Sequence, residues 1–224
     1  MNKIFYISDF FVEHIIGGGE LNDHELIEMF SKERTSVTKL QSHMVTKDIL
    51  EKNKNSNFII SNFANLKHDC KLWLQQNAKY VIYEHDHKYV KTRNPANYKN
   101  FKAPDKDIIN YYFYRNALSV FVQSSFHEEI IQKNLCLDNV VNISGNLWSL
   151  KTLKILEELS KTKKNLTCSI LNSTTPHKNT HGAIKFCERK NLEYKKIASS
   201  NYIHFLKQLS ENKYFVFLPK TPET

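Results

Sequence analysis

Four titratable side chains stand consecutively at Glu84–His87, directly after the short apolar run Tyr80–Tyr83. A carboxylate beside an imidazole can take a proton from a hydroxyl group near neutral pH, so Asp86 and His85 are candidate catalytic residues. A metal site is an alternative, but adjacent ligands on alternating faces seldom converge on one ion and the sequence holds no second such cluster. We therefore expect no metal. A plain solvated loop is the remaining alternative.

A second feature with chemical potential is the run Gly17–Gly19, which holds three of the chain's 5 glycines and is followed by Glu20. Before it, Ile4–Ile7 favours a strand, and after it Leu26 belongs to a helical pattern with Asp23 among the intervening polar positions. Bare backbone and the free N–H groups of a helix start suit a phosphorylated ligand. The alternative is a turn that needs only positive φ.

Short apolar runs alternate with helical patterns along the whole chain. The expected strands are 4–7, 36–40, 58–61, 80–83, 119–123, 140–143, 166–171, 194–197 and 214–218. The expected helices are 21–30, 44–53, 67–77, 105–117, 126–135, 150–159, 180–190 and 201–211. This alternation predicts an α/β fold with mainly parallel sheets, whose ligands lie beyond the carboxyl ends of the strands. We expect one domain at residues 1–150 and a smaller one at residues 151–224.

Composition narrows the function classes. The net charge of +9 favours an anionic partner such as nucleic acid, an anionic membrane surface or a phosphorylated small molecule. The positive residues are spread along the chain, and no zinc-finger or RNP-like signature is present, so we expect no nucleic-acid partner. The four scattered cysteines form no C-x-x-C pair and are expected to be ordinary buried thiols. A dinucleotide-binding oxidoreductase is disfavoured because the G-x-G-x-x-G fingerprint is missing.

The expected location is cytoplasmic. No apolar run approaches the roughly 18 to 20 residues of a membrane span, and Met1–Lys3 leads directly into a strand without a signal peptide. Attachment to the periphery of a membrane is compatible with the positive charge.

Several motifs together resemble the GT-B glycosyltransferases. The likeness is to the large retaining group, family 4-like or "group 1", that includes glycogen synthase-like enzymes and lipopolysaccharide mannosyl- and glucosyltransferases. The segment 17–20 resembles that family's G-G-x-E loop, 120–125 its A-D-x-v-i-a-x-S strand, and 143–146 its i-P-N-G turn. Strand 170–173 with Lys178 resembles the family's K-G region, with Asn179 where glycine is usual, and 217–223 resembles the opening of the E-x7-E motif.

The resemblance implies two Rossmann-like domains, the second incomplete, with residues 1–150 on the acceptor side and residues 151–224 binding a nucleotide-sugar. It implies transfer of a sugar, expected to come from a UDP-sugar, to a hydroxyl on an acceptor sugar, lipid or other compound, without a cofactor. The implied donor and phosphate contacts are Gly17, Gly18, Gly19, Glu20, Ser173, Lys178 and Glu223.

The sequence stops one residue after Glu223, before the family's second glutamate and final helices. We therefore expect a C-terminally shortened protein, and a weakly catalytic sugar-nucleotide-binding protein remains an alternative. The last strand, Tyr214–Leu218, should be left partly uncovered. The protein should then form a homodimer or bind a partner through it, unless the helix Leu150–Leu159 folds back over the exposed face.

Overall fold

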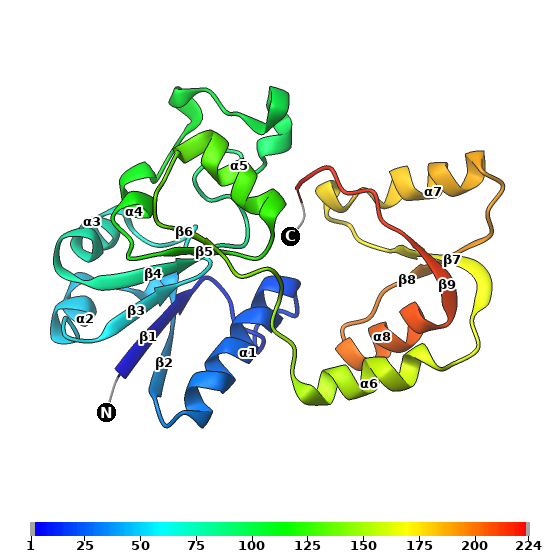
Figure 1. Ribbon diagram of the computed structural model, residues 1–224, viewed down its shortest axis with the longest axis horizontal. Coiled ribbons are helices and arrows are strands. Elements are labelled where there is room, and N and C mark those ends of the chain that lie inside the picture. Colours follow the sequence, from blue (N-terminus) through cyan, green and yellow to red (C-terminus); the bar gives the residue numbers. More distant parts are fainter. Residues whose placement is uncertain (1–2, 223–224) are drawn as a thin grey trace. The chain divides into compact units, whose positions relative to one another are not determined.

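The computed structural model describes residues 3–222, which form two compact units that divide between Leu147 and Trp148 (Figure 1). We call residues 3–147 the N-terminal unit and residues 148–222 the C-terminal unit. The division lies three residues before the expected boundary at residue 150. Each unit is an α/β structure with its own parallel sheet, which confirms the predicted fold class.

The sheet of the N-terminal unit has six strands in the order β2-β1-β3-β4-β5-β6, and every pairing is parallel. The strands are β1 (Lys3–Ser8), β2 (Ser36–Gln41), β3 (Asn57–Ile60), β4 (Lys79–Tyr83), β5 (Val120–Val122) and β6 (Val140–Asn142). The strand order reverses at β1, which has β2 on one side and β3 on the other. In open α/β sheets such a switch point leaves a crevice at the carboxyl ends of the strands, where ligands bind.

Helices cover both faces of this sheet. They are α1 (Gly18–Lys32), α2 (Lys47–Lys52), α3 (His68–Asn77), α4 (Tyr111–Arg115) and α5 (Ser125–Leu135). Because side chains alternate along a strand, Phe5 and Ile7 join a large core with α2, α3, α4 and α5, whereas Ile4 and Tyr6 face Ile27 of α1. Burial on both faces explains why the strands read as continuous apolar runs.

The helix predicted over residues 105–117 is wrong, since only α4 and a short 3-10 turn form there. Ile108 instead makes an antiparallel bridge to Val90, and Asn110 takes a left-handed conformation (φ 56°) that ends any continuous helix. The 3-10 turns of the described chain are Ser42–Met44, Pro95–Asn97, Lys99–Phe101, Asp105–Asp107 and Pro176–Lys178.

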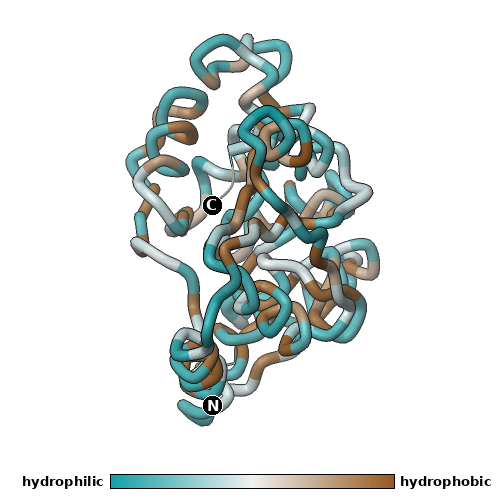
Figure 2. Tube along the Cα trace, turned by 90° about the vertical axis from the view of Figure 1, so that its right-hand side faces the viewer, coloured by the Kyte–Doolittle hydropathy of each residue, from teal (hydrophilic) through white to brown (hydrophobic). Residues whose placement is uncertain are grey.

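The C-terminal unit has a three-stranded parallel sheet in the order β8-β7-β9. Its elements are α6 (Leu150–Ser160), β7 (Asn165–Leu171), α7 (Thr180–Arg189), β8 (Tyr194–Ile197), α8 (Tyr202–Ser210) and β9 (Asn212–Val216). Its small core joins Cys168 and Ile170 of β7 to Ala183 and Cys187 of α7. Figure 2 shows hydrophobic residues interspersed with hydrophilic ones along the described chain.

The edge strand β9 leaves Tyr214 and Phe215 exposed, which confirms the expected partial exposure of the last strand. Three cysteines are buried, but Cys136 is exposed because it forms the left-handed end of α5, contrary to the expectation for that residue. Among the residues that the structure describes, no helix combines the length and the apolar character needed to cross a bilayer.

Candidate functional site

The carboxylate of Asp23 gathers polar groups from three elements at the switch point of the N-terminal sheet. Its Oδ1 accepts hydrogen bonds from the hydroxyl groups of Tyr6 and Ser61, each at 2.8 Å, and lies 2.8 Å from Nε2 of His85. Its Oδ2 accepts from the Ser8 hydroxyl at 3.3 Å. Asp23 is fully buried, so its charge is stabilised by these donors and not by water.

The sequence reading missed Asp23 by assigning it to the polar side of the first helix. A signal was nevertheless present, because Asp23, Ile27 and Phe30 follow the i, i+4, i+7 spacing of one helix face. Ile27 is buried and Phe30 packs against the same core, so this face carries Asp23 into the interior.

The ring of His85 is oriented by α1. Oδ1 of Asp23 already accepts hydrogen bonds from two hydroxyl groups. We therefore assign a proton to Nε2 of His85, which donates the third hydrogen bond to this oxygen. The same edge of the ring faces Gly19, where a Cβ atom would lie 3.4 Å from Cδ2 of His85. This leaves Nδ1, on the other edge of the ring, as the proton acceptor of the imidazole.

The three glycines do not adopt positive φ, so the alternative interpretation, a turn that needs only positive φ, is wrong. Gly17 is extended (φ −133°, ψ 168°), and Gly18 and Gly19 belong to the first turn of α1. A Cβ atom at Gly17 would meet Oε2 of Glu20 at 2.4 Å, and one at Gly19 would press on His85, whereas no described atom lies within 4 Å of a Cβ at Gly18. Gly17, the N-cap of α1, makes no side-chain cap hydrogen bond, and the carboxylate of Glu20 in the first turn interacts with its own backbone N–H.

Glu20 lies beside the polar strand ends. Its Oε1 accepts a long hydrogen bond of 3.5 Å from Nδ2 of Asn62, which follows β3. Burial raises the pKa of Glu20, and the negative charges of Asp23 and Asp86 add to that shift. The structure therefore brings Glu20, Gly19 and His85 to one edge of the sheet.

Asp86 differs from His85 in its surroundings. It forms an ion pair with Arg93, and its side chain is 39% exposed. Burial alone would raise its pKa, but the positive charges of Lys88 and Arg93 outweigh that effect and hold the pKa of Asp86 below its ordinary value. An ionised carboxylate with a lowered pKa is a weak base, so geometry and charge favour His85 over Asp86 as the proton acceptor.

Glu84, the first residue of the titratable run, has a structural role. Glu84 is fully buried, accepts hydrogen bonds from the Tyr114 hydroxyl and from Nζ of Lys88 at 2.9 Å, and also binds the backbone N–H of Asp86 at 2.9 Å. Burial would raise the pKa of Glu84, but the charge of Lys88 outweighs it and lowers that pKa. This pair fixes the loop that carries His85.

A buried histidine pair lies next to this loop. The rings of His87 and His127 are 4.4 Å apart, and His87 contacts the Tyr89 hydroxyl at 2.8 Å. Burial lowers the pKa of His127 to about 3, so this ring is neutral at physiological pH.

The turn 143–146 is attached to α1. Asn22 donates to Oδ1 of Asn146 at 2.9 Å and accepts from the backbone N–H of Leu147 at 2.8 Å. Asn22 is buried and, like Asp23, was not identified from the sequence.

In the C-terminal unit the loop after β7 holds Ser173 and Lys178. The hydroxyl of Ser173 accepts from the backbone N–H of Thr175 at 3.1 Å, and Nζ of Lys178 lies 5.7 Å from the ring centre of Phe217. Asn179 takes the left-handed conformation (φ 52°) that glycine would otherwise favour.

The segment after β9 lies against this loop. Nδ2 of Asn179 donates to the carbonyl of Leu218, and the backbone N–H of Lys220 donates to the carbonyl of His177, each at 2.8 Å. The structure thus brings two of the sequence motifs together within the C-terminal unit. Glu223 lies outside the described residues.

Within residues 3–222, no group of three or more His, Cys, Asp or Glu side chains is arranged to hold a metal ion.

Comparisons with known proteins identify the fold. No protein-family model matches the sequence, and a comparison with curated proteins finds no match either. Among solved structures, an alpha-glucosyltransferase in complex with UDP and a 13-mer DNA containing an HMU base is similar, with a TM-score of 0.55 and 12% identity over 95% of this chain and 71% of that one. An alpha-glucosyltransferase (AGT) in complex with UDP has a TM-score of 0.51 and 11% identity over 96% of this chain and 72% of that one.

A further alpha-glucosyltransferase complex, with UDP and a 13-mer DNA containing a central A:G mismatch, has a TM-score of 0.54 and 12% identity over 96% of this chain and 70% of that one. At such low identity these likenesses show the fold alone. The chain has a glycosyltransferase-like α/β fold of the GT-B type.

Proposed function

We propose that this protein is a glycosyltransferase that moves a sugar from a nucleotide-diphosphate sugar, a UDP-sugar, to a hydroxyl group of an acceptor. The observation that carries the proposal is the His85–Asp23 pair, 2.8 Å apart at the switch point of the sheet, in a fold similar to UDP-bound glucosyltransferases. A switch point is where open α/β folds bind their ligands.

His85 has the role of hydrogen-bonding the transferred sugar or the acceptor hydroxyl through Nδ1. Asp23 keeps the ring in one tautomer and stabilises the positive charge that forms if the ring takes a proton. Asp86, paired with Arg93, has the secondary role of orienting the loop that bears His85.

The uncapped start of α1 supplies N–H groups for the negative charge of the donor, and the open space above Gly18 leaves room for a ligand there. Glu20 is proposed to contact the donor or the acceptor at the same end of the helix. In the C-terminal unit, Ser173 and Lys178 are proposed to contact the diphosphate, where a positive charge offsets that of the leaving group. The family 4-like assignment and the role of Glu223 rest on the sequence resemblance.

Calorimetric titration with UDP, UDP-sugars, GDP-sugars and NAD tests the donor class. Binding of UDP or a UDP-sugar supports the proposal, and binding of NAD alone overturns it. Release of UDP from UDP-sugars is then measured with sugar, lipid and DNA acceptors. DNA is included because two of the similar structures hold DNA, against our expectation from the sequence. UDP binding without turnover identifies the weakly catalytic alternative.

A further inference from the structure

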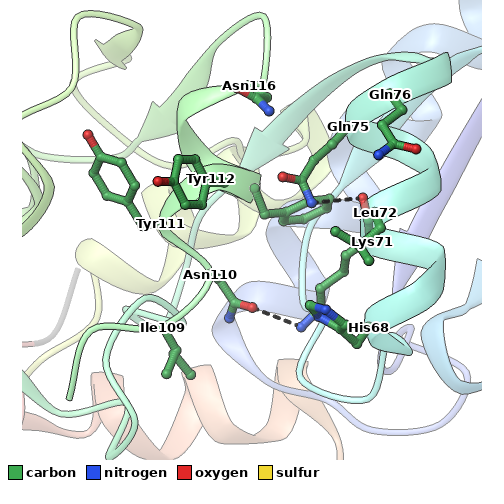
Figure 3. A pocket seen from close by; sticks show the side chains of 11 residues that line it. His68, Lys71, Leu72, Gln75, Gln76, Ile109, Asn110, Tyr111, Tyr112 and Asn116 are labelled. Carbon is green, nitrogen blue, oxygen red and sulfur yellow. Dashed lines mark hydrogen bonds between the residues drawn. The ribbon is translucent and has the colours of Figure 1, made fainter. Parts of the chain in front are cut away.

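A groove lies on the N-terminal unit between α3 and α4, with a volume of about 540 Å³ (Figure 3). This volume is within the range of small-molecule sites, about 300–1,000 Å³. The groove is not part of the His85–Asp23 network. Figure 3 shows Gln75 and Gln76 of α3 on one side of the groove. Tyr112 of α4 and Asn116, which directly follows α4, lie on the other side.

The walls of the groove combine aromatic rings with side-chain amides. Tyr111 and Tyr112 pack edge to face with their ring centres 5.3 Å apart, and Tyr112 is 67% exposed. Gln76 and Asn116 add amide groups, each of which can donate and accept hydrogen bonds. A surface of this kind matches a ligand that has many hydroxyl groups and an apolar face, such as a pyranose ring.

The charge of the groove argues against a nucleic acid. The residues that line it include one lysine, Lys71, and no arginine, and Lys71 donates to Oδ1 of Asn110 at 3.1 Å. Burial also lowers the pKa of Lys71. Nucleic-acid affinity depends on several lysine or arginine contacts to phosphates, so this lining suits a neutral ligand better.

Buried and partly buried contacts beneath the groove connect its two walls to the loop that bears His85. The Lys71–Asn110 hydrogen bond links its two walls, and Nδ2 of Asn110 donates to the carbonyl of Lys88 at 2.8 Å. Lys71 and Lys88 lie over the same Phe63 ring, with Nζ at 5.2 and 5.5 Å from its centre. Lys88 in turn pairs with Glu84, which adjoins His85.

From these contacts we propose that the groove between α3 and α4 binds a neutral oligosaccharide, the sugar chain of the acceptor, and directs its reactive hydroxyl toward the strand ends that hold His85. The inference rests on the proposed transferase function and adds the chemical class of the acceptor. Tyr112 stacks on a sugar ring, and Gln76 hydrogen-bonds its hydroxyl groups.

The experiment measures binding of the full chain to an array of neutral and acidic oligosaccharides, without any donor, together with Tyr112→Ala, Gln76→Ala and the control Tyr194→Ala. Tyr112 and Gln76 are exposed, so both variants should fold, and unchanged thermal unfolding midpoints check this. Tyr194 is a surface tyrosine of β8, outside the groove. We expect a neutral oligosaccharide to bind, with affinity reduced about tenfold by Tyr112→Ala and about fivefold by Gln76→Ala, and unchanged in the control.

Three results overturn the inference. The first is that no oligosaccharide binds, and the second is that one binds with equal affinity to both groove variants. The third is that a single-stranded DNA 13-mer, tested in parallel, binds and loses affinity in Tyr112→Ala, which would identify a nucleic-acid groove. UDP titration of wild type and the same variants tests the proposed function separately. If the protein is a UDP-sugar transferase, all of these proteins should bind UDP with equal affinity, even where the groove binds no oligosaccharide.

Discussion

Nε2 of His85 and Oδ1 of Asp23 are 2.8 Å apart, although the two residues are 62 positions apart in the chain. Asp23→Asn should keep the shape of this site but remove the carboxylate that three hydroxyl groups and the imidazole share. We expect turnover of a UDP-sugar to fall by about 10²-fold or more, the usual contribution of a positioned acid or base.

His85→Ala should cause a similar loss, and the double variant should be no worse, because residues that act as a unit are not additive. Asp48→Asn, an exposed acid on α2, is the matched control. Full turnover in Asp23→Asn with loss in His85→Ala would show that the imidazole acts without its partner.

Lys178→Ala tests the phosphate contact of the C-terminal unit. We expect UDP binding to weaken by about 1.5 to 3 kcal/mol, as for loss of a hydrogen bond to a charged group. Lys185→Ala removes an exposed positive charge from α7 and should leave the affinity almost unchanged. Calorimetric titration of both variants with UDP is the measurement. If Lys178→Ala binds UDP as tightly as Lys185→Ala does, Lys178 is not part of the donor site.

The buried ring of His127 should make the fold sensitive to acid. In the unfolded chain this histidine takes a proton below pH about 6.5, but in the folded chain only below a pKa of about 3. The unfolded state therefore binds more protons between these values, and stability falls as pH falls through that window. At pH 5 the loss from this residue is about 2 kcal/mol relative to pH 7.

His127→Leu should remove most of this pH dependence, measured as the difference between urea unfolding free energies at pH 7 and pH 5. Glu84, Lys88, His85 and His87 act on the same ring and stay in place in the variant. His181→Leu changes an exposed histidine and serves as the control. An identical pH dependence in wild type and His127→Leu would contradict the assignment.

The exposed edge strand β9 predicts self-association or a partner. Tyr214 and Phe215 point to opposite faces, and the Phe215 ring stacks on Phe217 with centres 5.8 Å apart. We expect sedimentation to show concentration-dependent association in the micromolar range, reduced by Phe215→Ser. A monomer at every concentration, with no binding of a hydrophobic dye, would favour the fold-back of α6 instead.

The alternation of short apolar runs with helical patterns was sufficient to predict the parallel sheets. Strands that are buried on both faces consist of continuous apolar runs such as Tyr80–Tyr83. Periodicity failed for residues 105–117, where Ile108 and Tyr112 share a helical spacing. The left-handed Asn110 and the pairing of Ile108 with Val90 depend on contacts far from that window.

The candidate site was predicted only in part. The position after a strand was enough to select His85 and Asp86 together but not to choose between them, since parallel strands present their carboxyl ends at one edge. The partner of His85 was harder to select, because the spacing with Ile27 and Phe30 places Asp23 on the buried face of the helix whereas its charge favours solvent. The tertiary contacts with Tyr6, Ser61, Ser8 and His85 make its burial favourable, and the local sequence does not contain them.

The close approach of Gly19 to the His85 ring gives the molecule an internal reporter. A Cβ at Gly19 would lie 3.4 Å from Cδ2 of His85, so the first turn of α1 and the imidazole share one contact surface. An anion seated on that turn changes the field at the ring, and the NMR resonance of the proton on Cδ2 should shift in proportion to occupancy. Ligand screening on this protein can therefore be read from one histidine signal, without turnover and without knowledge of the acceptor.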